Sequence, residues 1–237
     1  MFLDDFHTRD TGRMRISANQ ASRFAKRMAG DYNPIHDPEA RRFCVPGDLL
    51  FALVLAQHGL SQRMTFHFRG MVGDGMPLGI HVRDDASLSV QDDAGKEVLF
   101  VERGGETTRD PLVIEAFTRR YIAFSGRNFP HYLKPLMEER GVMFNPQRPL
   151  VIYDSMGFTL DSLDIAALAV EFAGSSFDIN GKRGEAHLQF RMTSRGEAVG
   201  SGSKKLVVSG LRDYDAEVMD AFVDEFIRRK TCDETID

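Results

Sequence analysis

The same order of sequence patterns occurs twice along the 237-residue chain. Each half begins with an amphipathic helix pattern, continues through an irregular segment that contains proline and an apolar segment, and ends with strand patterns of period two. The second series begins at Ile114, and its last strand pattern ends at Ser209. Because such a repeat indicates internal duplication, we expect two units, residues 1–110 and residues 111–237, the second with an added C-terminal helix.

The first unit has well-marked helix ends. Ser17 and Gln20 have the spacing of a capping box, and Gly30 is suited to end that helix. Residues 49–56 are apolar on all sides and rich in Leu and Ala, which predicts a buried helix with Asp48 as its N-cap and Gly59 as its C-cap. Strands are expected at residues 64–68, 78–82, 87–91 and 97–103, and the breaker-rich residues 104–111 are expected to link the units.

The second unit repeats this order. A helix is expected at residues 114–124, ending at Ser125 and Gly126. The apolar residues 150–163 are expected to contain the second buried helix, around residues 153–163, by analogy with residues 49–56. The remaining expected elements are three strands at residues 167–179, 185–193 and 198–209, and an amphipathic helix at residues 215–229.

Composition limits the class of protein. With 42% hydrophobic residues the chain can bury a core, and a net charge of -5 with a pI near 5.8 argues against nucleic-acid binding. No apolar run is long enough to cross a bilayer, so we expect no membrane partner. The N-terminus lacks the pattern of a signal peptide, and two cysteines are too few for a disulfide framework. We therefore expect a cytoplasmic protein.

The segment from Gly30 to Pro38 is the strongest candidate for a functional site. Asn33-Pro34 and Asp37-Pro38 bracket His36, and a residue before proline is pushed out of the α region. Asp31 and His36 thus lie on a stiff, irregular segment that can direct two polar side chains into a cleft. Taken singly, Asp31 is also typical of a helix-terminal or turn aspartate, and His36 of a buried histidine bonded to the backbone.

These residues resemble the MaoC-like, or (R)-specific enoyl-CoA hydratase, family. Its motif is close to G-D-x-N-P-x-H-x-D, and residues 30–36 match it as far as the His; residues 45–50 (V-P-G-D-L-L) and 72–74 (V-G-D) match two weaker family segments. The resemblance covers residues 13–103. It implies an α+β double hotdog: two antiparallel sheets, each wrapped around a buried central helix, packed edge to edge as an intramolecular pseudo-dimer. The protein would be a pseudo-dimeric monomer or a homodimer.

The resemblance also implies a lyase that needs no cofactor. It would hydrate 2-enoyl thioesters of coenzyme A or acyl carrier protein, or dehydrate the products, with Asp31 and His36 holding the water as catalytic pair. We expect Gly47 to donate a backbone hydrogen bond to the developing oxyanion. Expected substrate-binding residues are Asn33, Asp48, Arg41 and Arg42; the two arginines could meet coenzyme A phosphates or simply be solvated. A metal site at Asp31, His36 and Asp37 has no supporting Cys/His cluster, so we expect no metal.

Three departures keep other functions open. Asp48 replaces an apolar residue of the family, Pro46 replaces a usual His, and the connection from His36 to Gly47 is short. In the second unit, residues 126–131 look like a degenerate copy of the motif with Arg127 in place of the acid, so we expect that unit to be catalytically silent. A hotdog thioesterase, or an acyl-thioester binding or regulatory protein without catalysis, are the alternatives.

Overall fold

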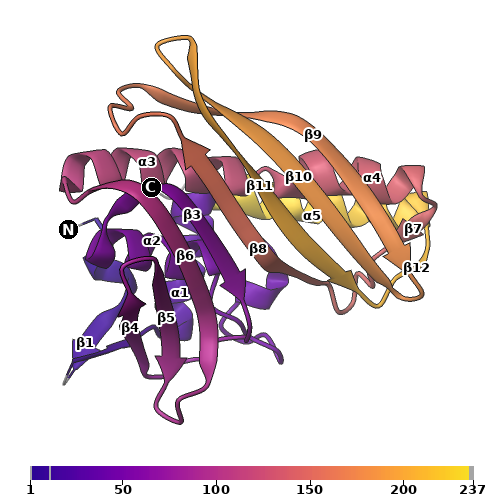
Figure 1. Ribbon diagram of the computed structural model, residues 1–237. Helices are drawn as coiled ribbons and strands as arrows, with labels where there is room; N and C mark the ends of the chain where they lie inside the picture. The colour runs from indigo at the N-terminus through magenta and orange to yellow at the C-terminus, as the bar shows by residue number, and fades with distance from the viewer. Residues whose placement is uncertain (1, 11, 235–237) are drawn as a thin grey trace.

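The computed structural model describes residues 2–10 and 12–234. Its main feature is one ten-stranded antiparallel sheet with the order β1-β2-β4-β5-β6-β3-β8-β11-β10-β9 (Figure 1). The strands of this sheet are β1 (Thr8–Asp10), β2 (Arg13–Arg15), β3 (Leu60–Phe68), β4 (Leu78–Asp84), β5 (Ser87–Asp92), β6 (Glu97–Thr108), β8 (Leu150–Leu160), β9 (Leu168–Asn180), β10 (Arg183–Ser194) and β11 (Glu197–Ser209). A small second sheet pairs β7 (Val142–Met143) with β12 (Arg212–Asp213).

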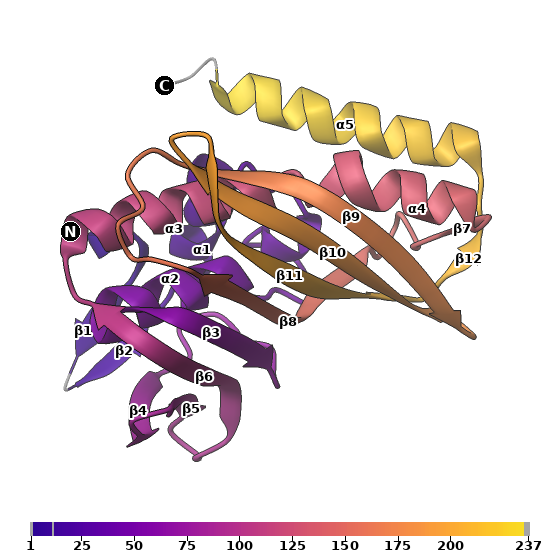
Figure 2. The ribbon, with the colours of Figure 1, turned by 45° about the horizontal axis from the view of Figure 1, so that its top comes forward.

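Helices pack against this sheet: α1 (Ala18–Phe24), α2 (Gly47–His58), α3 (Pro111–Ser125), α4 (Leu133–Glu139) and α5 (Ala216–Glu234). The sheet curves around α2 and α3, which lie side by side (Figure 2). Their contact is aromatic, since the Phe51 ring of α2 stacks on the Tyr121 ring of α3 with centroids 4.6 Å apart. None of the described helices is both long and apolar enough to span a membrane.

The architecture is an α+β double hotdog, as expected from the resemblance. Strands β1 to β6 come from the first half of the chain and β8 to β11 from the second, and β3 pairs with β8 where the halves meet. This seam holds the pairs Arg63–Thr159, Met64–Phe158, Thr65–Gly157, Phe66–Met156 and His67–Ser155. The two expected sheets are therefore one continuous sheet, joined edge to edge within one chain.

The expectation of a buried helix at residues 150–163 is wrong. Residues 150–160 form strand β8, which lies in the interior of the sheet between β3 and β11. Residues 150–153 (L-V-I-Y) form a short apolar run, and periodicity alone cannot distinguish such a run in a strand from part of a buried helix. The central helix of the second unit is α3, which sequence analysis identified as a helix but did not assign to that role.

The linker between the two units is also shorter than the expected residues 104–111. Residues 104–108 belong to β6 and pair with β3, and Thr107 and Thr108 lie opposite Ser61 and Leu60. Only residues 109 and 110 separate β6 from α3. The division of the chain at residue 110 stays a prediction.

Helix ends follow the sequence closely, with one exception. Ser17 and Gln20 form the expected capping box, and Gly30 ends the turn after α1 with a left-handed φ of 63°. Gly59 follows α2 with a φ of 92°. Asp48, however, is not the N-cap of α2: Pro46 takes that position, and Asp48 is the second helical residue, with its side chain buried.

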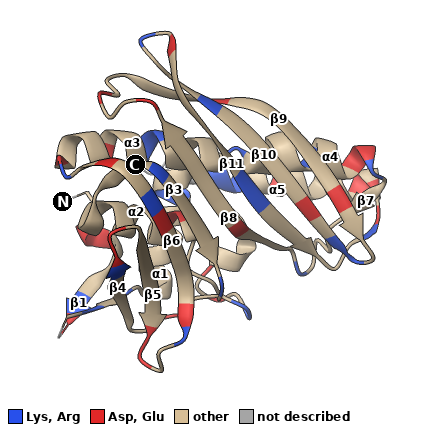
Figure 3. Cartoon of the chain, in the orientation of Figure 1, with Lys and Arg blue, Asp and Glu red and all other residues tan. Residues whose placement is uncertain are grey.

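Helix α5 runs beside α4 and covers the second unit (Figure 2). Its Phe222 ring lies edge-on to Phe129 and Phe144, and its Phe226 ring lies edge-on to Phe129 and Tyr32. The outer face of the sheet carries acidic and basic residues in mixed positions (Figure 3). Ion pairs such as Lys205 with Glu185 and Arg191 with Glu171 join neighbouring strands there.

Candidate functional site

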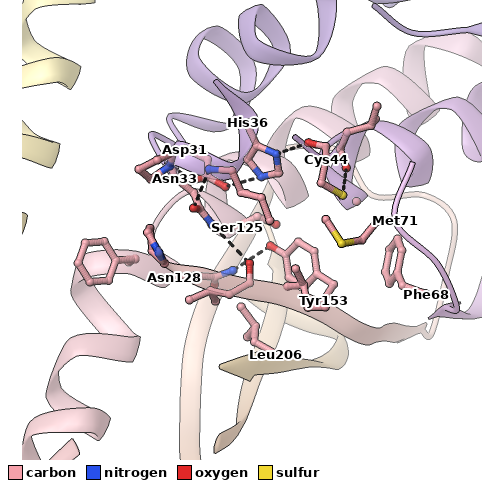
Figure 4. Close-up of a pocket in the computed structure, with 18 of the residues that line it drawn as sticks. Asp31, Asn33, His36, Cys44, Phe68, Met71, Ser125, Asn128, Tyr153 and Leu206 are labelled. Carbon is pink, nitrogen blue, oxygen red and sulfur yellow. Dashed lines mark hydrogen bonds and ion pairs between the residues drawn. The ribbon is translucent and has the colours of Figure 1, made fainter. Parts of the chain in front are cut away.

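A cavity of about 230 Å³ lies where the two units meet. Its walls come from the segment around Asp31, the start of α2, the residues after β3, the end of α3, the first half of β8, and α5. Figure 4 shows Asp31, Asn33 and His36 on one side of it and Asn128 and Tyr153 on the other. Both units therefore build one site.

Asp31 and His36 face each other at this cavity. The Oδ2 atom of Asp31 lies 3.6 Å from Nε2 of His36, and the side chains are 33% and 12% exposed. The other carboxylate oxygen of Asp31 accepts a hydrogen bond from the Asn33 amide at 2.9 Å. The separation is too long for a good direct hydrogen bond but suits one water that donates to both groups.

The hydrogen bond at the other ring nitrogen of His36, Nδ1, determines the tautomer of the neutral ring. Nδ1 lies 2.7 Å from the Cys44 carbonyl oxygen. Because a carbonyl only accepts, Nδ1 carries the hydrogen, and Nε2 of the neutral ring offers its lone pair toward Asp31. His36 therefore makes the hydrogen bond to a backbone carbonyl that is typical of a structural histidine. Because this bond uses Nδ1, Nε2 remains available for proton transfer.

Asn33 holds the segment in place. Its Oδ1 accepts from the Ile35 amide at 3.2 Å, and residues 34–36 form one short 3₁₀ turn. Its Nδ2 donates to the Val151 carbonyl of β8 at 3.3 Å, which ties the first unit to the second. Asn33 lines the cavity, but its side-chain amide is already used within the protein.

Gly47 lines the cavity and begins α2. A Cβ there would lie 2.9 Å from the Tyr153 ring and 3.0 Å from the Phe68 ring, so the glycine makes room for two aromatic side chains. As the first helical residue it has an amide N–H without an acceptor inside the helix. That amide, at the positive end of α2, is suited to a partial negative charge.

The structure does not bring the remaining expected substrate-binding residues to the cavity wall. Asp48 is 3% exposed, and its two carboxylate oxygens accept hydrogen bonds from Ser125 at 2.9 Å and Tyr153 at 3.2 Å. It therefore lies behind the wall and not on it. Arg41 and Arg42 are exposed on the segment between His36 and α2, outside the residues that line the cavity.

Four residues on the opposite side were not predicted from the sequence: Ser125, Asn128 and Tyr153, which line the cavity, and Lys204, which is buried behind them. The Asn128 side chain donates to the Tyr153 hydroxyl at 2.8 Å, and Lys204 donates to Ser125 Oγ. Two signals could have found them. Asn128 lies in the segment expected to be a degenerate copy of the motif, and Lys204 shares the core-facing side of β11 with Leu206 and Val208 at period two.

Burial raises the pKa of two groups near the cavity, Cys44 and Asp48. Burial raises the pKa of the Cys44 thiol, which keeps it protonated and argues against a nucleophile. Burial also raises the pKa of Asp48, although the nearby Lys204 ammonium and the Ser125 hydrogen bond oppose this. Within residues 2–10 and 12–234, no group of three side chains is placed to hold a metal ion.

The apolar part of the cavity lies under the second unit. It is lined by Phe129, Leu133, Phe144, Leu206, Phe222 and Phe226. The buried helix α2 contributes little to this lining, since of residues 49–55 only Leu50 lines the cavity. The others pack in the core, because α2 is enclosed by the sheet and by α3.

Comparison with known proteins gives a family. A protein-family model, described as "Protein of unknown function (DUF3581)", matches residues 1–217. The chain belongs to the DUF3581 family. No curated protein matches this DUF3581 member.

Several solved structures resemble the fold of this DUF3581 protein. A MaoC-like dehydratase has 11% identity and a TM-score of 0.41 over 85% of this chain and 97% of its own. A TesB protein of Mycobacterium avium subspecies paratuberculosis has 10% identity and a TM-score of 0.45, over 87% and 96%. The peroxisomal multifunctional enzyme type 2 of Drosophila melanogaster has 10% identity and a TM-score of 0.46, over 82% and 47%. At such low identity the activity has to be inferred from this chain's own residues.

Proposed function

We propose that this protein is an (R)-type hydratase or dehydratase of 2-enoyl thioesters. One observation carries the proposal: a carboxylate and an imidazole Nε2 lie 3.6 Å apart at a largely apolar cavity, with the imidazole oriented by a backbone carbonyl. The resemblance of the segment with Asp31 and His36 to the MaoC-like motif supports the same assignment, and it is the reason for proposing the (R) stereochemistry.

The pair can activate one water. A water bound between Asp31 Oδ2 and His36 Nε2 donates both hydrogens to them, which turns an oxygen lone pair toward the cavity. As that oxygen adds to C3 of the enoyl group, the pair takes one water proton. Delivery of a proton from the pair to C2 completes the addition and returns both side chains to their starting state.

Negative charge develops on the thioester oxygen while water adds. The Gly47 amide at the start of α2 is the proposed donor to this oxygen, and such a donor contributes about 3 kcal/mol of transition-state stabilisation. The acyl chain would lie among the aromatic residues of the second unit, away from water. Coenzyme A or acyl carrier protein would remain outside the cavity.

Incubation of the purified protein with crotonyl-CoA tests this function. Hydration removes the enoyl absorbance without releasing a free thiol, and the product can be resolved as the (R)-3-hydroxy isomer. Release of a free thiol would instead show a thioesterase. Binding of crotonyl-CoA without either change would show an acyl-thioester binding protein.

A further inference from the structure

A buried ion pair lies directly behind the cavity wall. The Lys204 side chain is 0% exposed, and its Nζ lies 3.9 Å from Oδ1 of Asp48. Nζ also lies 4.1 Å from the centre of the Tyr121 ring and 5.5 Å from that of Tyr153. The pair connects β11 of the second unit to α2 of the first.

This pair is costly for a protein core. Burial lowers the pKa of Lys204 to about 8, and the Asp48 carboxylate only partly offsets that effect. The groups that face Lys204 are Asp48 from α2, Tyr121, Phe124 and Ser125 from α3, and Tyr153 from β8. Asp48 is the one carboxylate among them. Since well-packed apolar residues often replace a buried pair without loss of stability, its presence beside a cavity points to a function.

The donors and acceptors of the hydrogen bonds around the Asp48–Lys204 pair can be assigned consistently. An ionised Asp48 only accepts, so the Ser125 and Tyr153 hydroxyls donate to its two oxygens. Lys204 then donates to Ser125 Oγ, and Asn128 donates to the Tyr153 oxygen. Ser125, Asn128 and Tyr153 all line the cavity. The network therefore sets the orientation of three wall residues that come from the second unit.

Tyr153 is the most consequential of the three. Its ring lies against Gly47 and beside Phe68, with ring centroids 5.9 Å apart. The position of this ring decides how closely a ligand approaches the Gly47 amide. Its hydroxyl is bonded to Asp48, which immediately follows Gly47, so ring and amide are held by the same turn of α2.

We propose that Asp48 and Lys204 are positioning residues that hold Tyr153 over Gly47 and so set the width of the acyl-thioester cavity opposite Asp31 and His36. The inference rests on the proposed function for its substrate class. It gives the second unit a part in the site, although its copy of the motif has lost the acid. The pair itself does not touch the substrate.

The test uses the apolar double variant Asp48→Leu/Lys204→Met, since either single change leaves a buried charge unpaired and can prevent folding. Two quantities are measured: the Kd for butyryl-CoA by calorimetry, and kcat and KM for crotonyl-CoA hydration. Tyr153→Phe, alone and combined with the double variant, shows whether the pair acts through the Tyr153 hydroxyl. Lys205→Met is the matched control, because Lys205 is the next residue of β11 and pairs with Glu185 on the outer face.

We expect the double variant to melt at or above the wild-type temperature, while its Kd for butyryl-CoA rises about tenfold and its kcat/KM falls about a hundredfold. Tyr153→Phe should give a similar loss, and the combined variant should lose little more, because all act through one contact. Unchanged Kd and kcat/KM in the double variant, or losses that add with those of Tyr153→Phe, would overturn the inference. If the wild type binds butyryl-CoA but does not hydrate crotonyl-CoA, the proposed function fails and the Kd values alone decide the positioning role. Absence of butyryl-CoA binding would overturn both proposals.

Discussion

His131 was aligned with His36 in the sequence, as part of an expected degenerate copy of the motif, but the surroundings of the two histidines differ. His36 is 12% exposed, bonded to the Cys44 carbonyl and opposite Asp31. His131 is exposed and absent from the cavity lining, and Arg127 stands at the position aligned with Asp31. The sequence identified Asp31 and His36 because both lie in one short segment. It did not identify Tyr153 and Lys204 because they reach the site from β8 and β11, and only folding brings them together.

The first prediction compares the two histidines. His36→Ala should lower the rate of crotonyl-CoA hydration about a thousandfold, because it removes one of the two groups that exchange protons with water. His131→Ala should stay within about twofold of wild type. Hydration rates of the two variants, each checked for folding by circular dichroism, give the comparison. A loss in His131→Ala as large as that in His36→Ala would show that the second unit is the active one.

The second prediction concerns pH and stability. Lys204 has a folded-state pKa of about 8 against an ordinary 10.5, so between these values the unfolded chain binds the extra proton. The free energy of unfolding should therefore rise with pH across this window, by on the order of 3 kcal/mol in total. Below pH 8 both states hold the proton and the full penalty remains.

Urea unfolding from pH 7.5 to pH 10.5 measures this effect, with Asp48→Leu/Lys204→Met as reference, since it lacks the buried amine. The wild type should gain stability relative to the double variant as the pH rises. Parallel pH profiles for the two proteins would mean that Lys204 titrates as an ordinary lysine.

At the scale of elements, α5 is attached to the segment that carries Asp31 and His36. Nη2 of Arg229 lies 2.8 Å from both carboxylate oxygens of Asp37, the residue after His36, and Nη1 donates to the Tyr32 carbonyl at 3.4 Å. Lys26 also pairs with Asp37 at 3.2 Å. The sequence predicted this helix from its period, but its partner could not be read from a pattern that describes only its own apolar face.

The third prediction follows from this attachment. Arg229→Met should lower kcat for hydration about tenfold, because His36 loses the support of its neighbour, and should cost about 1 kcal/mol of stability. Arg228→Met is the control, since Arg228 pairs with Glu225 on its own helix. The kcat for hydration and the free energy of unfolding in urea are measured for both variants. Equal kcat values for the two variants would show that α5 does not support the segment that carries Asp31 and His36.

Two apolar segments show which kind of secondary structure could be predicted from the sequence and which could not. Residues 49–56 and residues 150–163 are both apolar over much of their length, yet the first forms α2 and the second mainly β8. Leu and Ala in the first favour helix, while Val151, Ile152 and Tyr153 favour strand. Analogy with the first unit outweighed these preferences, and the analogy was wrong because α3 already fills the place of the central helix.

For the whole molecule, the decisive feature is the seam between β3 and β8. Duplication in the sequence predicted two units, and the resemblance to the MaoC-like family predicted their edge-to-edge packing, but neither predicted which strands pair. The cavity lies beside this seam, with Phe68 at the end of β3 and Tyr153 on β8 both in its wall. The width of the site therefore depends on the register of the two units.

The fourth prediction tests the seam. Gly157 lies opposite Thr65, and a Cβ there would be 3.2 Å from the Met64 carbonyl oxygen. Gly157→Val should destabilise the protein by about 2 kcal/mol through overpacking and should also reduce hydration. Gly73→Val is the control, since a Cβ at Gly73 has nothing within 4 Å. Thermal unfolding and crotonyl-CoA turnover measure both effects, and a Gly157→Val protein as stable and active as the control would contradict the role given to the seam.

The central claim is that Asp31 and His36 activate a water for addition to an enoyl thioester. The most direct measurement is the rate of crotonyl-CoA hydration by wild-type protein and by Asp31→Asn, each with its melting temperature. Asparagine keeps the shape of Asp31 and its bond to the Asn33 amide but cannot take a proton. We predict hydration by the wild type, a loss of about a thousandfold in Asp31→Asn, and melting temperatures within about 2 °C of each other. Hydration by Asp31→Asn at the wild-type rate would contradict the claim.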